Sequence, residues 1–213
     1  MKEVLIVGGG TSYPIKNHLS LSAPAYGSTA RRLEKLCKDF FPDLRIVTAL
    51  TKMADPSSDI ETYDDLAEFT RTWAQKRTLK IVFYNPAVVD FIPKVPAEFE
   101  RNTRLSSKHN YSIELKPLPK LIHIFRGTEH ANRKDVFVVG FKQTYQSSEE
   151  AQYKAGLEML KKNQINLVLA NDTFSHVNMI ITPEEASYSI TKNRSEVLYN
   201  LVEMTKSFAN WNN

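Results

Sequence analysis

Short runs of apolar residues alternate along the chain with longer segments in which apolar residues recur every three or four positions. The short runs are rich in valine, isoleucine and leucine, which is typical of buried strands. They span residues 4–7, 44–50, 79–84, 136–141 and 165–170. The periodic segments predict helices, one that begins with Ser28 or Thr29 as N-cap and ends before Pro42, and others over 64–76, 148–163 and 194–208.

The order of these elements predicts the fold class. A chain that starts strand–helix–strand–helix–strand implies right-handed crossovers and a largely parallel sheet. We therefore expect an α/β protein with a three-layer Rossmann-like fold, in which helices cover both faces of a mostly parallel central sheet. Residues 177–182 and 188–191 alternate in polarity and predict a smaller C-terminal β-meander. A length of 213 residues suits a single domain over 1–213.

Two segments interrupt this pattern. Residues 12–25 contain Pro14 and Pro24 and are expected to be irregular. Residues 91–110 form a lid-like excursion that exceeds the usual length of a loop, and long loops in compact domains often close over a site. The excursion is followed by an alternating stretch over 111–115, read as a strand, and by a short helix over 118–125.

Composition narrows the class of protein. Hydrophobic residues make up 42% and charged residues 24% of the chain, which excludes wholesale disorder. No apolar run is long enough for a membrane span, the first strand leaves no room for a signal peptide, and Cys37 is the single cysteine. We therefore expect a cytoplasmic protein without a membrane partner. The net charge of +4 is scattered rather than concentrated in a stripe, so we expect no nucleic-acid partner.

The first strand runs directly into Gly8-Gly9-Gly10-Thr11. Glycines at the end of a strand let backbone N–H groups approach a phosphate or a carboxylate closely. The triplet matches neither G-x-G-x-x-G nor the P-loop, so a plain tight turn is an equal reading. Residues 85–90 follow the third strand and are expected at the same carboxyl edge of the sheet, where ligands of such folds bind.

Six motifs occur in a characteristic order along the chain. They are VLIVGGGTSYPI (4–15), AVVDFIP (87–93), RLSS (104–107), VVGFKQT (138–144), LVLAND (167–172) and Thr191-Lys192 before the last helix. With these motifs the sequence resembles the phosphopantothenoylcysteine synthetases, also called phosphopantothenate–cysteine ligases, over nearly its whole length.

The resemblance implies a role in coenzyme A biosynthesis. The family activates phosphopantothenate with CTP or ATP as an acyl nucleotide, and the amine of cysteine then displaces the nucleotide. The implied co-substrate is CTP or ATP, with Mg²⁺ assisting and with a phosphopantothenate-like acid and cysteine as small-molecule partners. No residue of the chain is singled out as a metal ligand. The family also implies a homodimer built through the later strands, here a hairpin and dimerisation extension over 172–192.

The resemblance also implies a set of site residues. Those expected to bind the nucleotide are Gly9, Gly10, Thr11, Ala87, Asp90, Phe141, Lys161, Lys162 and Asn171. Arg104 occupies the position of a lid lysine that contacts the nucleotide, and together with Asn17 and His18 it is a candidate catalytic residue. Each has a plainer reading beside the functional one: Phe141 as core, Asp90 as a turn cap, Asn171 as a turn residue. Lys161 and Lys162 are ordinary at a helix C-terminus, and which of the two reaches phosphate stays open.

The chain departs from the family in one loop. Where the family has Asp, Arg, Asn and two serines, the ungapped alignment places Lys16, Leu19, Ala23 and Ala25-Tyr26, and it retains only Gly27. Leucine and alanine side chains can neither bind phosphate nor donate a hydrogen bond. Three hypotheses follow. The first is a divergent ligase in which Asn17, His18 or Lys16 replaces the missing groups. The others are a nucleotide- or metabolite-binding paralogue without ligase activity, and a ligase that activates another carboxylic acid. We take the ligase-like function as the main prediction.

Overall fold

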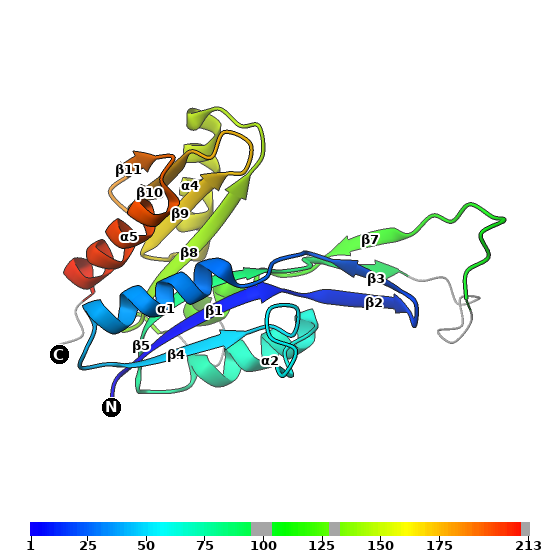
Figure 1. The fold of residues 1–213 in the computed structure, drawn as a ribbon, viewed down its shortest axis with the longest axis horizontal. Helices are drawn as coiled ribbons and strands as arrows, with labels where there is room; N and C mark the ends of the chain where they lie inside the picture. Colours follow the sequence, from blue (N-terminus) through cyan, green and yellow to red (C-terminus); the bar gives the residue numbers. More distant parts are fainter. Residues whose placement is uncertain (95–103, 128–132, 210–213) are drawn as a thin grey trace.

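The computed structural model describes residues 1–94, 104–127 and 133–209. Its core is a seven-stranded sheet in the order β11-β10-β9-β8-β5-β1-β4 (Figure 1). The five parallel strands are β1 (Glu3–Gly10), β4 (Arg45–Leu50), β5 (Leu79–Ala87), β8 (Phe137–Thr144) and β9 (Leu167–Asp172). Two antiparallel strands, β10 (Asn178–Ile181) and β11 (Ser187–Thr191), extend one edge. The predicted mostly parallel sheet and its C-terminal meander are confirmed.

Helices cover both faces of the sheet and bury its apolar strands. On one face lie α1 (Ser28–Phe40) and α5 (Arg194–Phe208), which pack on a cluster that includes Ile6 and Phe83. On the other lie α2 (Tyr63–Ala74), α4 (Glu149–Asn163), the 3-10 turn η1 (Leu121–His123) and α3 (Ile124–Gly127). Every residue of β1 is buried, as expected for a central parallel strand covered on both faces. The three-layer α/β prediction is therefore correct.

Local capping explains where the helices begin. The side chain of Ser148 accepts a hydrogen bond from the backbone N–H of Ala151, as the sequence predicts for α4. α2 begins with a capping box between Thr62 and Asp65, which the sequence analysis does not identify. The cap of α1 differs from the prediction: Gly27, in the left-handed region at φ 74°, holds the N-cap position, and Ser28 is the first helical residue.

Two hairpins extend from the carboxyl end of the sheet as a separate arm (Figure 1). The first pairs β2 (Ser12–Lys16) with β3 (Leu19–Ser22), so the prediction of an irregular segment over 12–25 is wrong. Pro14 is tolerated because a two-stranded ribbon has only edge strands. The second pairs β6 (Phe91–Lys94) with β7 (Glu114–Pro117). We define these two hairpins as the arm.

Two predicted elements near the arm are displaced along the sequence. The strand expected over 111–115 begins at Glu114, because its register is set by pairing with β6 rather than by its own alternation. The short helix expected over 118–125 starts at Leu121 and continues through α3. The predicted lid-like excursion begins with β6, and its residues 95–103 lie outside the described part of the chain. Among the described helices there is none with the length and apolar character to cross a bilayer.

Candidate functional site

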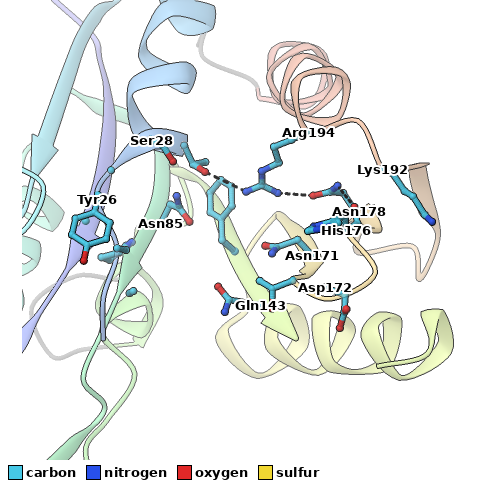
Figure 2. Close-up of a pocket in the computed structure, with 18 residues that line it drawn as sticks. Tyr26, Ser28, Asn85, Gln143, Asn171, Asp172, His176, Asn178, Lys192 and Arg194 are labelled. Atoms are coloured by element: carbon cyan, nitrogen blue, oxygen red, sulfur yellow. Dashed lines mark hydrogen bonds between the residues drawn. The ribbon is translucent and has the colours of Figure 1, made fainter. Parts of the chain in front are cut away.

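A cleft of about 550 Å³ opens at the carboxyl edge of the sheet (Figure 2). One wall is formed by Gly9 of β1, the loop before α1 and the end of β5, because the pairing of β1 with β5 places Gly10 beside Ala87. The opposite wall is formed by the ends of β8 and β9, the start of β10 and the turn that leads into α5. We call this the first cleft. Its position agrees with the edge at which ligands bind in open parallel sheets.

The glycine turn shapes the first cleft through its backbone. Gly9 has φ 101°, and a Cβ atom there would lie 2.2 Å from the side-chain oxygen of Thr51. Gly10 donates its N–H to the carbonyl of Ala25 at 2.8 Å, and this bond holds the loop that forms the rim. The hydroxyl of Thr11 accepts from the N–H of Val89 at 2.8 Å. Gly9 thus lines the cleft, whereas Gly10 and Thr11 support its walls.

Amide side chains and cations line the far wall of the first cleft. One Nη atom of Arg194 donates to the side-chain oxygen of Asn178 at 2.7 Å, and the other lies 3.4 Å from the hydroxyl of Thr29 across the cleft (Figure 2). Asn178 is fixed in turn, since its amide nitrogen donates to the carbonyls of His176 and Thr191. This chain of bonds connects β10, the start of α5 and the start of α1.

Asp172 lies at the same edge, but its carboxylate is used by the fold. One oxygen accepts from the N–H groups of Phe174 and Ser175, and the other accepts from the N–H of Ser147 and the hydroxyl of Thr144. These hydrogen bonds, the one from the Ser175 backbone first, hold the pKa of the Asp172 carboxyl well below its ordinary value. Asp172 therefore joins the loops after β8 and β9 and fixes the shape of the far wall.

A second cleft of about 320 Å³ adjoins the first. The two share Pro86, Phe141 and Gln143, so these residues form a common wall. Apolar side chains of Val88, Leu121, Ile122 and Met159 line part of the second cleft. Charged groups stand among them, with Asp90 and Lys120 joined as an ion pair and with Lys162 at the end of α4. The second cleft thus combines apolar side chains with charged groups, whereas the polar side chains of the first are mainly amides, hydroxyls and the cations Lys192 and Arg194.

The predicted nucleotide residues divide between the two clefts. Gly9, Ala87 and Asn171 line the first cleft, Asp90 and Lys162 line the second, and Phe141 belongs to both. Lys161 lines neither cleft and forms an ion pair with Glu185. The geometry therefore separates the two lysines that the sequence leaves equivalent, and Lys162 is the one beside a cavity.

The predicted catalytic residues lie on the arm and not at the clefts. Asn17 and His18 form the turn between β2 and β3, and Arg104 lies in the segment before β7. The Nε2 atom of His18 accepts a hydrogen bond from the N–H of Leu105 at 3.4 Å, so the two hairpins meet there. None of the three predicted catalytic residues lines either cleft in this conformation.

Several residues that line the clefts were not predicted as site residues from the sequence. Arg194, Asn178 and His176 reach the first cleft because β10 is antiparallel, so its start, like the end of β9, lies at the carboxyl edge. Lys120 reaches the second cleft from the loop before η1. The available signal was the position of Arg194 directly after Asn193, the N-cap of a helix that follows an edge strand.

Comparison with known proteins identifies proteins that this chain resembles. No family model matches the chain. The coenzyme A biosynthesis bifunctional protein CoaBC of Methanocaldococcus jannaschii is 25% identical over 214 residues, which cover 96% of this chain and 50% of that protein. The chain thus spans about half the length of the curated relative it matches.

Solved structures agree on the fold. The DNA/pantothenate metabolism flavoprotein from Streptococcus pneumoniae superposes with a TM-score of 0.76 at 20% identity, covering 98% of this chain and all of that one. The C-terminal domain of a CoaBC protein gives a TM-score of 0.68 at 14% identity, over 97% and 94% of the two chains. A Cab2 variant in complex with phosphopantothenate-cysteine also gives 0.68, at 13% identity over 97% and 86%. In sequence the chain is similar to a CoaBC protein, and in fold it is similar to all three of these solved structures.

Proposed function

We propose that the chain is a phosphopantothenate–cysteine ligase-like enzyme of coenzyme A biosynthesis. It would use a nucleotide to activate a carboxylic acid and then form an amide with cysteine. The observation that carries the proposal is the pair of clefts that share Pro86, Phe141 and Gln143 at the carboxyl edge. A ligase of this kind must hold a nucleotide and an acid so that one phosphate of the first meets the carboxylate of the second.

The chemistry of the two linings favours one division of the ligands. A nucleoside triphosphate is large and strongly anionic, which suits the first cleft, because it is the larger of the two and is lined by the cations Lys192 and Arg194. An acid with an extended chain suits the amphipathic second cleft, where apolar side chains flank Lys120 and Lys162. In this arrangement Phe141 separates the two ligands, and Asp90 and Lys162 face the acid and the phosphate that it attacks.

The reaction then has two steps. An oxygen of the acid attacks the α-phosphorus of the nucleotide, the bond to the departing diphosphate breaks, and pyrophosphate leaves. The amine of cysteine next attacks the acyl carbon, a proton passes from nitrogen to solvent or a basic group, and the nucleoside monophosphate leaves with the bonding electrons. Arg194 and Lys162 would neutralise phosphate charge from opposite sides of the shared wall.

Magnesium fits this site only as an ion carried by the nucleotide. Within the described parts of the chain, no three His, Cys, Asp or Glu residues form a group that could hold a metal. Mg²⁺ commonly binds through phosphate oxygens, waters and one or two carboxylates. Asp90 and Glu158 are the carboxylates that line the second cleft, and Asp90 is paired with Lys120. Mg²⁺ would supply charge neutralisation on the phosphates.

Turnover is the direct test of this proposal. Pyrophosphate release is measured with Mg²⁺, phosphopantothenate, cysteine and either CTP or ATP, and the amide product is identified by mass spectrometry. We expect release that depends on the acid, and at least a tenfold loss in Phe141→Ala because the shared wall is removed. The matched control is Phe174→Ala, an aromatic residue that is 61% exposed and lines neither cleft. Its activity should equal that of the parent protein.

Two other outcomes would select the alternative hypotheses. Nucleotide binding without pyrophosphate release for any acid would contradict the ligase and favour a binding paralogue. Release that requires a different carboxylic acid would keep the acyl-nucleotide chemistry and replace the substrate. The loss of the family side chains at Leu19, Ala23 and Ala25 gives both alternatives a chemical basis.

We also infer a homodimer formed through β11. This strand is one of the two edges of the sheet, the other being β4, and it exposes Tyr188 and Ile190 to about half of their full area. Unpaired strand edges with apolar side chains are pairing sites unless they are covered. A second copy of the chain could continue the sheet across this edge.

Sedimentation velocity at micromolar concentration tests the dimer. We expect the parent protein to sediment as a dimer and Ile190→Lys as a monomer with an unchanged melting temperature, because Ile190 contributes little to the core. Leu115→Lys on the arm is the matched control, since Leu115 is exposed to a similar extent. A monomeric parent protein would contradict the inference. If Leu115→Lys were a monomer and Ile190→Lys remained a dimer, the interface would lie on the arm instead of at β11.

A further inference from the structure

The far wall of the first cleft carries positive charge that no carboxylate balances. Arg194 and Lys192 both line it, and neither forms an ion pair within the described residues. The nearest acid of the lining, Asp172, directs its carboxylate away from Arg194 and into its own loops (Figure 2). Elsewhere in the described chain, surface cations such as Lys38 and Lys154 commonly pair with a nearby glutamate.

Arg194 is held in place by neutral groups. Its bonds run to an amide oxygen of Asn178 and to the hydroxyl of Thr29, and neither partner neutralises its charge. Burial lowers the pKa of the Arg194 guanidinium to about 10, and the neighbouring charge of Arg32 acts in the same direction. A partly buried cation without a counter-ion is unfavourable unless a ligand supplies one. The contacts with Asn178 and Thr29 orient it but leave donors of its five-donor fork for a ligand.

The opposite wall adds backbone donors to the same space. α1 is described in full, and it has no acidic residue in its first turn and no side-chain cap from Gly27. Its first N–H groups therefore have no partner within the helix and carry the positive end of the dipole. The rim residues Ala25 and Tyr26 bring no charge to this wall. Two guanidinium groups lie near this turn: that of Arg194 reaches the hydroxyl of Thr29, and that of Arg31 donates to the carbonyl of Tyr26.

We propose that Arg194 is the principal anion-binding residue of the first cleft and that it holds a phosphate group of the ligand against the first turn of α1, with Lys192 as a second cation at the rim. This rests on the proposed function and specifies which residues replace the phosphate ligands absent from the loop before α1. The guanidinium fork matches a phosphate with two parallel hydrogen bonds, which a lysine cannot reproduce. The phosphate belongs either to the nucleotide or to the acid.

Binding titrations test this proposal without depending on turnover. Isothermal titration is carried out with inorganic tripolyphosphate, CTP, ATP, cytidine, phosphopantothenate and pantothenate, each at low and at high salt. The variants are Arg194→Gln, Arg194→Lys and Lys192→Gln. Arg32→Gln is the matched control, because it removes the same charge close to Arg194 from an exposed position outside the cleft. Melting temperatures confirm that each variant is folded.

The expected result is a selective loss of anion binding. Arg194→Gln should weaken the binding of tripolyphosphate and of a phosphorylated ligand about 10- to 100-fold, as is usual for a lost charge-assisted pair. Arg194→Lys should recover part of that loss, and Lys192→Gln should weaken binding about 2- to 5-fold. Cytidine and pantothenate should bind the variants and the parent protein alike, and Arg32→Gln should change binding less than twofold.

The ligand panel identifies the source of the phosphate. Equal losses for CTP or ATP and tripolyphosphate, with phosphopantothenate unaffected, assign Arg194 to the nucleotide. A loss confined to phosphopantothenate assigns it to the acid. Anion binding that is unchanged in folded Arg194→Gln overturns the proposal, as does a parent protein that binds none of the anions or an Arg32→Gln effect as large as that of Arg194→Gln.

Two further results keep the test decisive. Within the described residues Lys192 forms no ion pair, so we expect Lys192→Gln to fold like the parent protein. If Arg194→Gln does not fold, unchanged tripolyphosphate binding in Lys192→Gln and Arg194→Lys overturns the proposal. A parent protein that releases no pyrophosphate but shows the Arg194-dependent binding would contradict the ligase alone. Turnover that is insensitive to Arg194 would contradict this inference alone.

Discussion

Replacing Gly9 with alanine is expected to destabilise the fold by about 3–5 kcal/mol and to abolish ligand binding in the first cleft. The backbone at Gly9 has φ 101°, which side chains other than glycine adopt only with strain. A Cβ atom would lie 2.2 Å from the side-chain oxygen of Thr51, 2.9 Å from Cβ of Ala54 and 3.1 Å from the backbone nitrogen of Thr51. Since one of these atoms is backbone, the strand end must shift. Urea unfolding and nucleotide titration measure the two effects.

Gly156→Ala is the matched control for this substitution. Gly156 lies in α4, where alanine favours the helix by about 1 kcal/mol. The new methyl group would meet Cδ1 of Ile181, the flexible end of a side chain. We expect a net change within about 1 kcal/mol and unaltered binding. A Gly9→Ala protein as stable as Gly156→Ala, with binding intact, would contradict the proposed role of the glycine turn.

Replacing Arg126 with methionine is expected to cost about 2–4 kcal/mol of stability, because buried acceptors lose their donor. Arg126 is only 8% exposed, and burial lowers the pKa of its guanidinium. Its nitrogens donate to the carbonyls of Gln164, Val136 and Arg133 and to the side-chain oxygen of Asn166. These bonds join the start of β8 to the turn before β9. Urea denaturation with an unchanged m-value would show a loss of stability without a change of fold.

The control for Arg126 is Arg71→Met on the exposed face of α2. Arg71 forms a solvent-exposed ion pair with Glu68 at 3.3 Å, and such surface pairs contribute little to the free energy of unfolding. We expect a change below about 0.5 kcal/mol. If Arg126→Met lowered the free energy of unfolding as little as Arg71→Met, water would have to satisfy the four acceptors. The hydrogen bonds of Arg126 would then contribute little to stability. Arg126→Lys should give an intermediate loss, because one ammonium cannot reach all four.

Much of the central sheet follows from local patterns in the sequence. Residues 81–84 and 167–170 are continuous apolar runs, and such runs need both faces covered, which a parallel sheet with helices provides. The glycine turn and residues 85–90 are predicted at the same edge, and Gly9 and residues 85–87 line the first cleft. The resemblance identified Phe141 and Asn171 as site residues, and the fold places both beside a cavity.

The arm could not be predicted in the same way. The register of β7 depends on pairing with Phe91 through Lys94, 20 to 26 residues earlier in the chain, so its own alternation gives the wrong boundaries. Pro14 and Pro24 indicate an irregular loop when read locally, yet Pro14 is accepted in an edge strand. Consequently the positions of Asn17, His18 and Arg104 on the arm, outside both clefts, were not evident from the sequence.

The sequence by itself determined the α/β class, the edge of the sheet at which the first cleft opens and the family that the chain resembles, because strand and helix periodicity and short motifs are local properties. Only the tertiary structure decided which side chains share a cavity. It places Lys162 at the second cleft and pairs Lys161 with Glu185. It also directs the carboxylate of Asp172 into hydrogen bonds with the neighbouring loops and places the guanidinium of Arg194 beside the first turn of α1. These outcomes depend on the reversal of direction at β10 and on packing between segments 165 residues apart, and no local pattern encodes such distances.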